Sequence, residues 1–361
     1  MRIGIVGLPN VGKSTLFNAL TKNYTADAQN FPFCTIEPNV GIVNVNDDRL
    51  EQIRNAVNGQ KIIPATCEFI DIAGIVKGAS NGEGLGNKFL ANIREADAIL
   101  QVVRVFENKD IVHVHGEINP KSDIEVINSE LILADLETLI KRLNSDSRKA
   151  KADKDLAFAV EVYKKIEIAL NKGQLVSDID LDEDELKAIR DLHLLTNKEF
   201  VYACNVSEDM MGETEENLKK ILGLENKKNR VVPICAKLES DMIDMDENER
   251  KEFLEEMGLT STGLDNLIKA SYDALGLQYY FTAGEKEVRA WTIHRGDTAP
   301  KAAGVIHTDF EKGFIKADVV NWKDIVEFGG WARAREAGKV ALEGKDYVVK
   351  DGDVMLFKFN N

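Results

Sequence analysis

Residues 7–14, with the sequence GLPNVGKS, have the spacing of a phosphate-binding loop: a glycine, four residues, and then Gly-Lys-Ser. In such a loop, successive backbone N–H groups and a helix N-terminus surround a phosphate, and glycines let the backbone come close. Lys13 is expected to reach the β- and γ-phosphates as a catalytic group, and the Ser14 hydroxyl to ligate Mg²⁺. The predicted nucleotide-binding residues of the loop are Asn10, Val11, Gly12, Lys13, Ser14 and Thr15.

The segments on either side of this loop match the elements that must position it. Residues 3–6 form a short apolar run that predicts a buried strand, and residues 15–20 space their apolar side chains as a helix does. Further buried strands are predicted at 41–45, 67–72, 98–104, 200–204 and 230–235. The pattern indicates an α/β protein with a P-loop NTPase domain.

Two further segments supply candidate groups for the phosphates and their metal ion. Thr35 lies in a proline-bracketed loop and suits the second Mg²⁺ ligand of a switch segment. Asp71 ends a predicted strand and is followed by Gly74 in the order DxxG, as a Walker-B type Mg²⁺ site requires. We therefore expect Ser14, Thr35 and Asp71 to hold Mg²⁺, with Asp71 acting indirectly or through water, and Gly74 to offer its N–H to the γ-phosphate.

Length and charge set limits on the partners. A chain of 361 residues should hold two or three domains, and its net charge of −15 means that any nucleic-acid contact needs a local basic patch. The N-terminus leads directly into a strand, and no apolar run is long enough to span a bilayer. The four cysteines are far apart in the sequence, which favours reduced thiols and a cytoplasmic protein without a membrane partner.

The middle of the chain predicts an inserted pair of helices. Apolar residues recur at helical spacing over 132–143 and 156–166, on either side of a charged run, which indicates an antiparallel hairpin or coiled coil. A third helix is predicted at 183–195. The tip of the hairpin is either a solvated helix face or a binding surface. Its basic residues are Lys141, Arg142, Arg148, Lys149, Lys151 and Lys154.

The chain then returns to the first domain and ends in a small one. Helices are predicted at 240–257 and 263–275, followed by strands at 279–282, 287–291, 347–349 and 354–359 and a helix at 299–306, an order that fits a mixed β-grasp fold. The predicted domains are a P-loop NTPase domain (1–127 and 197–277), the helical hairpin (128–196) and a TGS domain (278–361).

Several motifs together resemble one family. The P-loop, Thr35, DxxG and the segment 205–208 look like the motif series of Ras-like, translation-factor-related P-loop NTPases. The stretches FPFCTIEP (31–38), KGAS (77–80), GEGLG (82–86) and HTDFEKGFIKA (307–317) narrow the resemblance to the YchF proteins, the Obg-like ATPases, over essentially the whole chain.

This resemblance implies a G-domain interrupted by a helical hairpin, then a C-terminal β-grasp TGS domain. It also implies an Mg²⁺-dependent ATPase that hydrolyses ATP to ADP and phosphate and is linked to translation and stress responses. The implied partner is the ribosome, as the large subunit or the 70S particle, with RNA contact through the local basic patch. Two alternatives stay open, a GTPase of the same architecture and a nucleotide-binding scaffold with negligible turnover.

The base motif of this superfamily, Asn-Lys-x-Asp, is altered here. Val206 replaces the lysine whose stem covers guanine, and Glu208 replaces the aspartate that accepts from its N–H groups. A carboxylate one methylene longer should no longer bracket guanine, whereas Asn205 can still read an adenine edge and Val206 can contact the ring. We therefore expect ATP to be preferred over GTP.

Water activation needs a group outside the usual position. Ras-like enzymes carry a glutamine after the DxxG glycine, but here the residue is Ile75, which cannot orient water. The resemblance points to His113 as the catalytic histidine, with His115 as its rival. Asn10 stands where potassium-activated members of the superfamily carry asparagine, which predicts that K⁺ accelerates turnover.

Overall fold

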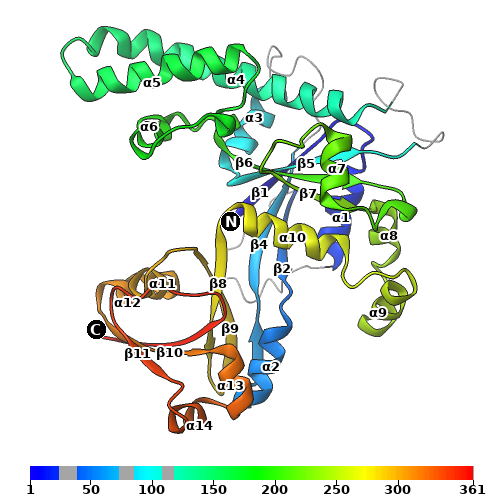
Figure 1. Cartoon of the computed structure of the whole chain (residues 1–361), viewed down its shortest axis with the longest axis vertical. Helices are drawn as coiled ribbons and strands as arrows, with labels where there is room; N and C mark the ends of the chain where they lie inside the picture. Colours follow the sequence, from blue (N-terminus) through cyan, green and yellow to red (C-terminus); the bar gives the residue numbers. More distant parts are fainter. Residues whose placement is uncertain (24–38, 73–84, 108–117, 361) are drawn as a thin grey trace. The chain divides into compact units, whose positions relative to one another are not determined.

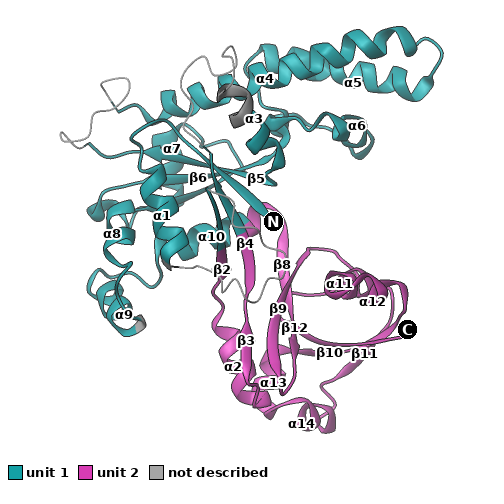
Figure 2. Ribbon diagram, turned by 180° about the vertical axis from the view of Figure 1, so that it is seen from behind, with its two compact units in different colours: residues 1–42, 68–271 teal, residues 43–67, 272–361 magenta. Residues whose placement is uncertain are grey.

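The computed structural model of the chain describes residues 1–23, 39–72, 85–107 and 118–360. It divides into two compact units, Met1–Ile42 with Glu68–Ser271, and Val43–Cys67 with Tyr272–Asn361 (Figure 2). This division does not follow the predicted domains, because Val43–Cys67 groups with the C-terminal residues rather than with the rest of 1–127. The three-domain boundaries therefore stay a prediction, whereas the α/β class is confirmed.

Unit 1 is built on a six-stranded sheet with the strand order β2-β4-β1-β5-β6-β7 (Figure 1). From β4 to β7 every neighbouring pair is parallel, so the carboxyl ends of these strands meet at one edge of the sheet. Every residue of the central strand β5 is buried, as expected where both faces of a parallel sheet are covered. The strands are β1 Arg2–Val6, β2 Val40–Val45, β4 Ala65–Asp71, β5 Ala98–Arg104, β6 Glu199–Asn205 and β7 Arg230–Ile234. Residues 43–45 of β2 and 65–67 of β4 belong to unit 2.

The helices of this unit follow the predictions in part. The predicted helix over 240–257 is wrong: the chain forms two helices, because Asp246 caps the second one by accepting from the N–H groups of Asn248 and Glu249. The predicted helix over 183–195 is shorter. A 3-10 turn, Arg190–Leu192, follows it, and the cap residue His193 has a φ of 47°. The helices are α1 Lys13–Asn23, α3 Leu85–Glu95, α6 Glu183–Ile189, α7 Glu215–Leu222, α8 Ala236–Asp241, α9 Glu247–Glu256 and α10 Gly263–Ala274.

The inserted hairpin consists of α4 (Pro120–Lys149) and α5 (Lys154–Asn171), which lie side by side (Figure 1). Helix α4 starts before the predicted insertion, since Asn119 caps it and Pro120 stands in its first turn, where a missing N–H is harmless. At its root, buried Asp135 accepts from the N–H groups of Leu195 and Thr196, in the short turn η5 (Leu195–Asn197) that leads into β6.

Unit 2 has its own six-stranded sheet, in the order β11-β10-β12-β8-β9-β3, and a buried core of its own. Strands β8 and β12 are parallel whereas β8–β9 and β10–β12 are antiparallel, and helix α11 packs on them, as in a β-grasp fold. The predicted strand at 347–349 is wrong, because only a single bridge joins Val348 to Thr298. Strand β10 was not expected, since its apolar residues do not alternate.

The elements of unit 2 are α2 Asp48–Val57, β3 Lys61–Ile63, β8 Leu277–Ala283, β9 Glu287–His294, α11 Ala299–Ile306, α12 Thr308–Lys312, β10 Phe314–Asn321, α13 Trp322–Phe328, α14 Trp331–Glu336, β11 Ala341–Glu343 and β12 Asp353–Phe359. In the part of the chain that the structure describes, no helix is both long enough and apolar enough to cross a membrane.

Candidate nucleotide-binding site

The glycine-rich loop between β1 and α1 has the geometry of a phosphate cradle. Gly12 has a φ of 97°, and a Cβ atom placed on it would lie 2.3 Å from Asn205 Nδ2. The Gly12 carbonyl accepts from the N–H of Leu16 at 2.9 Å and so joins the loop to α1. Asn10 also has a positive φ, of 66°. These features are typical of a phosphate-binding loop, in which backbone N–H groups face an anion.

Lys13 and Asp71 lie together at the carboxyl edge of the sheet. Strands β1 and β4 pair with Ile5 opposite Asp71, and the Lys13 ammonium forms an ion pair with the Asp71 carboxylate. Both side chains are largely buried, whereas Ser14 is exposed on the first turn of α1. An ammonium and a carboxylate held next to an exposed hydroxyl are the groups that a phosphate chain and a divalent ion require. Thr35, Gly74, Ile75, His113 and His115 lie outside the described residues.

Asn205 connects the two sides of the site. Its Nδ2 donates to the Val11 carbonyl at 2.9 Å, and its Oδ1 accepts from the N–H of Ala236 at 3.2 Å. Both ends of the amide therefore have backbone partners, one in the P-loop and one after β7. This geometry favours a role in which Asn205 positions the P-loop against the segment after β7. For Asn205 to hydrogen-bond an adenine edge, as predicted, one of these two bonds would have to open.

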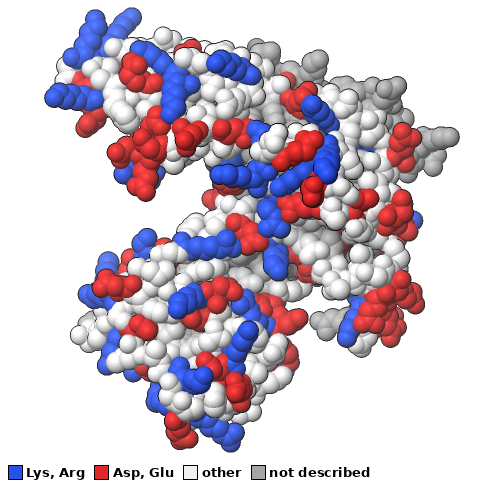
Figure 3. All heavy atoms as spheres, in the orientation of Figure 1, with Lys and Arg blue, Asp and Glu red and all other residues white. Residues whose placement is uncertain are grey.

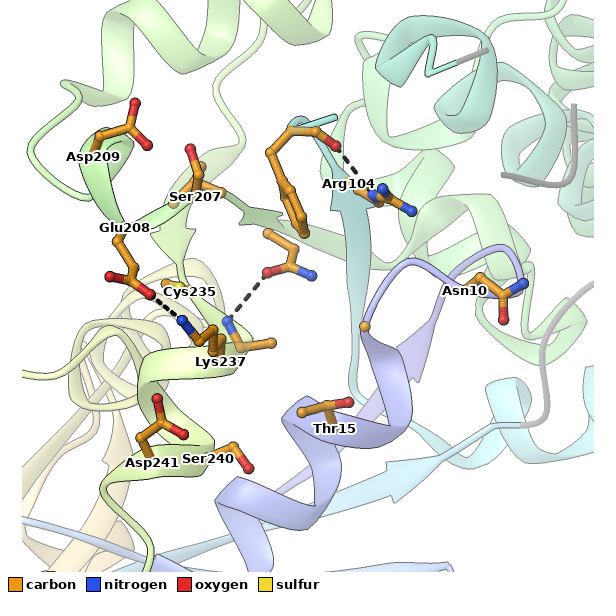
Figure 4. Close-up of a pocket in the computed structure, with 15 residues that line it drawn as sticks. Asn10, Thr15, Arg104, Ser207, Glu208, Asp209, Cys235, Lys237, Ser240 and Asp241 are labelled. Atoms are coloured by element: carbon orange, nitrogen blue, oxygen red, sulfur yellow. Dashed lines mark hydrogen bonds and ion pairs between the residues drawn. The ribbon is translucent and has the colours of Figure 1, made fainter. Parts of the chain in front are cut away.

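Between the P-loop, β5, β6 and α8 lies a cavity of about 640 Å³, within the size range of small-molecule sites (Figure 4). It brings together several predicted site residues, since Asn10, Gly12 and Thr15 line it with Asn205, Val206 and Glu208. The other lining residues are Arg104, Phe106, Ser207, Asp209, Cys235, Ala236, Lys237, Ser240 and Asp241.

Arg104 and Phe106, at the end of β5, are site residues that the sequence reasoning missed. Arg104 is only 1% exposed, its Nε donates to the Phe106 carbonyl at 3.1 Å, and its guanidinium lies 4.8 Å from the centre of the Phe106 ring. Burial lowers the pKa of Arg104. The signal in the sequence is an arginine that ends an otherwise uncharged strand, AILQVVR.

At the end of the cavity away from Asn10, Glu208 and Lys237 form an ion pair (Figure 4). Lys237 Nζ lies 2.7 Å from Glu208 Oε1, and this hydrogen bond raises the pKa of Lys237. Burial raises the pKa of the neighbouring Cys235 thiol. Sequence reasoning placed Lys237 at the end of a strand but did not count it among the site residues.

Comparison with known proteins agrees with this architecture. A family model described as a 50S ribosome-binding GTPase matches residues 2–172, and the YchF-GTPase C-terminal model, described as a protein of unknown function, matches residues 277–360. Two curated relatives named Ribosome-binding ATPase YchF are each 54% identical to this chain. The match to the Bacillus subtilis protein covers 99% of this chain and 98% of the relative. The match to the Escherichia coli O157:H7 protein covers 99% of this chain and 99% of the relative.

Two solved structures match over nearly the full length. The structure of the Schizosaccharomyces pombe YchF GTPase superposes with a TM-score of 0.87 at 36% identity and covers 99% of this chain and 97% of its own. A GTP-binding protein from Pyrococcus horikoshii, 21% identical and covering 100% of both chains, matches with a TM-score of 0.62 and shows the same fold.

Proposed function

This chain belongs to the YchF family, and on that premise we propose that it is a ribosome-binding ATPase. It would hydrolyse ATP to ADP and phosphate, and its nucleotide state would switch its binding to the ribosome. The observation that supports this most directly is the P-loop cradle at the edge of a cavity large enough for a nucleotide, in a chain similar over its full length to proteins named ribosome-binding ATPases.

The residues of the phosphate end would act as follows. A P-loop domain of this kind works with a divalent metal ion beside its nucleotide, and we take this ion to be Mg²⁺ held by Ser14, Thr35 and Asp71. When bound, Mg²⁺ neutralises charge on the phosphates. When nucleotide binds, the Lys13 ammonium would break its ion pair with Asp71 and contact the β- and γ-phosphates. The Asp71 carboxylate would then be available to the metal ion.

The base end would prefer adenine. Val206 and Glu208 both line the cavity, and they stand where a guanine site needs a lysine and an aspartate. A site built to hydrogen-bond one base edge rejects another base by leaving buried polar groups unpaired. A GTPase of the same architecture is the alternative, and tighter binding of GTP than of ATP in calorimetry would establish it.

For the attacking water, we propose His113 as the group that orients it, with His115 as the rival, because Ile75 cannot. Asn10 would hold a K⁺ ion beside the phosphates, where a cation stabilises developing charge. Loss of turnover with intact ATP affinity in His113→Ala would support His113 as the group that orients water. Loss of turnover only in His115→Ala would contradict that assignment. Equal rates in KCl and NaCl would remove the K⁺ site.

The ribosome contact is proposed at the free end of the hairpin, in a cytoplasmic protein. Lys and Arg side chains gather there (Figure 3), and Arg148, Lys149, Lys151 and Lys154 are all exposed. Exposed cations on a chain with a net charge of −15 are a local patch suited to RNA phosphates. The partner would be the large subunit or the 70S particle.

The proposal is tested with purified protein and Lys13→Ala. We expect the wild type to hydrolyse ATP and to sediment with ribosomes to different extents with no nucleotide, an ATP analogue or ADP. Lys13→Ala should lose ATP binding, ATP hydrolysis and the nucleotide dependence of ribosome sedimentation. Undetectable hydrolysis with intact binding would instead identify a nucleotide-binding scaffold. Unchanged ATP affinity in Lys13→Ala would remove the assignment of the P-loop.

A further inference from the structure

We propose that the Glu208–Lys237 ion pair is a latch at the base end of the cavity that slows nucleotide release, an inference that rests on the proposed function. Glu208 begins the turn η6 (Glu208–Met210) after β6, and Lys237 stands in the first turn of α8 after β7. Both side chains line the cavity, and their contact joins the two walls that enclose it on this side (Figure 4).

The two walls are already tied at their base by buried bonds. The N–H of Val206 donates to the Ile234 carbonyl at 2.9 Å, and Asn205 accepts from the N–H of Ala236. Asn205 and Val206 are 6% and 1% exposed, so these bonds lie in the protein interior. These bonds hold the two walls together at the bottom of the cavity. At its rim, the walls are joined by the side chains of Glu208 and Lys237.

The Glu208–Lys237 ion pair differs from these buried bonds because it is exposed to solvent. The side chains of Lys237 and Glu208 are 73% and 43% exposed, so water and salt reach the pair and it can open without disturbing the fold. An exposed ion pair of this kind changes an equilibrium constant by up to about fivefold. That is the size of effect expected on the escape of a nucleotide between the walls.

A purely electrostatic effect predicts something different. Glu208, Asp209 and Asp241 put negative charge at this end of the cavity, whereas Lys237 is a cation. If charge alone mattered, removing Lys237 would weaken binding of an anionic nucleotide, but neutralising Glu208 would strengthen it. A latch predicts that both changes speed release, because either one breaks the same contact.

The test measures release of a fluorescent ADP analogue, chased with excess unlabelled ADP, by stopped-flow. We expect Lys237→Ala and Glu208→Gln each to release it about two- to fivefold faster than the wild type. The double variant should be no faster than either single one, since the two residues act through one contact. Lys237→Arg should restore slow release, and high salt should speed the wild type more than the variants.

Lys220→Ala is the matched control, because it breaks another exposed ion pair, Lys220–Glu216 on α7, whose residues do not line the cavity. Its release rate should equal that of the wild type. Slower release in Glu208→Gln, additive effects in the double variant, or an unchanged rate in Lys237→Ala would overturn the latch while leaving the proposed function intact. Failure of the wild type to bind ADP or ATP would overturn both.

Discussion

At Gly12 the side chain of Asn205 leaves no space for a Cβ atom. A Cβ atom there would lie 2.3 Å from Asn205 Nδ2, and a φ of 97° is a conformation that L-residues rarely adopt. Gly12→Ala must therefore push Asn205 away from Val11 or change the loop. We expect ATP affinity to fall at least about tenfold, with a loss of stability of about 1–2 kcal/mol.

Calorimetric titration with ATP and thermal unfolding measure these two effects. Gly212→Ala is the control, because nothing lies within 4 Å of a Cβ atom at that position. It should bind ATP like the wild type. Wild-type ATP affinity in Gly12→Ala would mean that the loop does not cradle the phosphates in this conformation.

Glu239 gives the stability of the protein a dependence on pH. Its side chain is buried on α8 and accepts from the N–H groups of Gly263 and Leu264 at the start of α10. Burial raises the pKa of Glu239 to about 7, from an ordinary value of 4.5. Between pH 4.5 and about pH 7 the folded protein keeps a proton on Glu239 that the unfolded chain has lost. The stability that Glu239 contributes is therefore full below the unfolded pKa and is lost as the pH rises through the folded pKa.

Glu239→Gln should remove this dependence, since glutamine stays neutral and its oxygen can still accept. Between about pH 5.5 and about pH 8, we expect the wild type to lose on the order of 2 kcal/mol of stability relative to the variant. Calorimetric melting would show this as a fall of a few degrees in the wild-type midpoint relative to the variant. Parallel midpoints across this range would show that Glu239 is ionised when folded.

At the scale of elements, Asp135 fixes the root of the hairpin. Its Oδ1 accepts from the N–H of Leu195 at 2.8 Å, and its Oδ2 accepts from Thr196 N and Oγ1 at 2.8 and 2.7 Å. Asp135→Asn keeps the shape but turns an NH₂ group toward groups that donate. We expect a loss of about 2–4 kcal/mol, because buried donors are left unpaired.

Hydrogen exchange at Leu195 and Thr196, together with the thermal midpoint, would report this loss. Asp184→Asn is the control, since its carboxylate is 78% exposed and pairs only with Lys187 among the contacts described. Its effect should stay within about 0.5 kcal/mol. Equal midpoints for the two variants would show that Asp135 does not anchor the hairpin.

Local pattern predicted those elements whose signal is contained in their own residues. The P-loop has its Gly-Lys-Ser motif, and the parallel strands and the two hairpin helices have regular apolar spacing. Each was found, although α4 extends beyond the predicted helix at both ends. The break between α8 and α9 depends on one capping aspartate inside a helical pattern, and residues 347–349 look like a strand but make only one bridge. Apolar periodicity cannot detect either feature.

The candidate site was predictable where a motif fixes backbone geometry, as in the P-loop. The sequence could not show that Lys13 contacts Asp71, because that contact depends on the pairing of β1 with β4. It also could not show that Arg104 and Lys237 line the same cavity, since they come from strand ends that are distant in the chain. These pairings are tertiary, so they follow from the fold rather than from any local spacing.

At the scale of the whole molecule, the distribution of charge decides how a polyanion can be bound. The chain carries a net charge of −15, so RNA contact at the hairpin tip must rely on a few local cations. Reversing Arg148, Lys149 and Lys151 to glutamate should abolish ribosome sedimentation at physiological salt. Wild-type binding should itself weaken steeply as salt is raised.

The control reverses three exposed lysines elsewhere in unit 1, Lys228, Lys251 and Lys269, and so changes the net charge equally. If this control loses binding as completely as the tip variant, the effect is one of total charge and not of a contact. Unchanged sedimentation of the tip variant would show that the hairpin tip is not the contact.

The chain passes between the two units after residues 42, 67 and 271, and this order matters while the protein is being synthesised. Helix α2 and strand β3 leave the ribosomal exit tunnel early, but β3 pairs with β9, which emerges more than two hundred residues later. Until then the apolar face of α2, with Leu50 and Ile53, has no core to join. While the whole hairpin is translated, α2 and β3 therefore stay without their partners, and unit 2 can fold only after the strands from β8 to β12 have been synthesised.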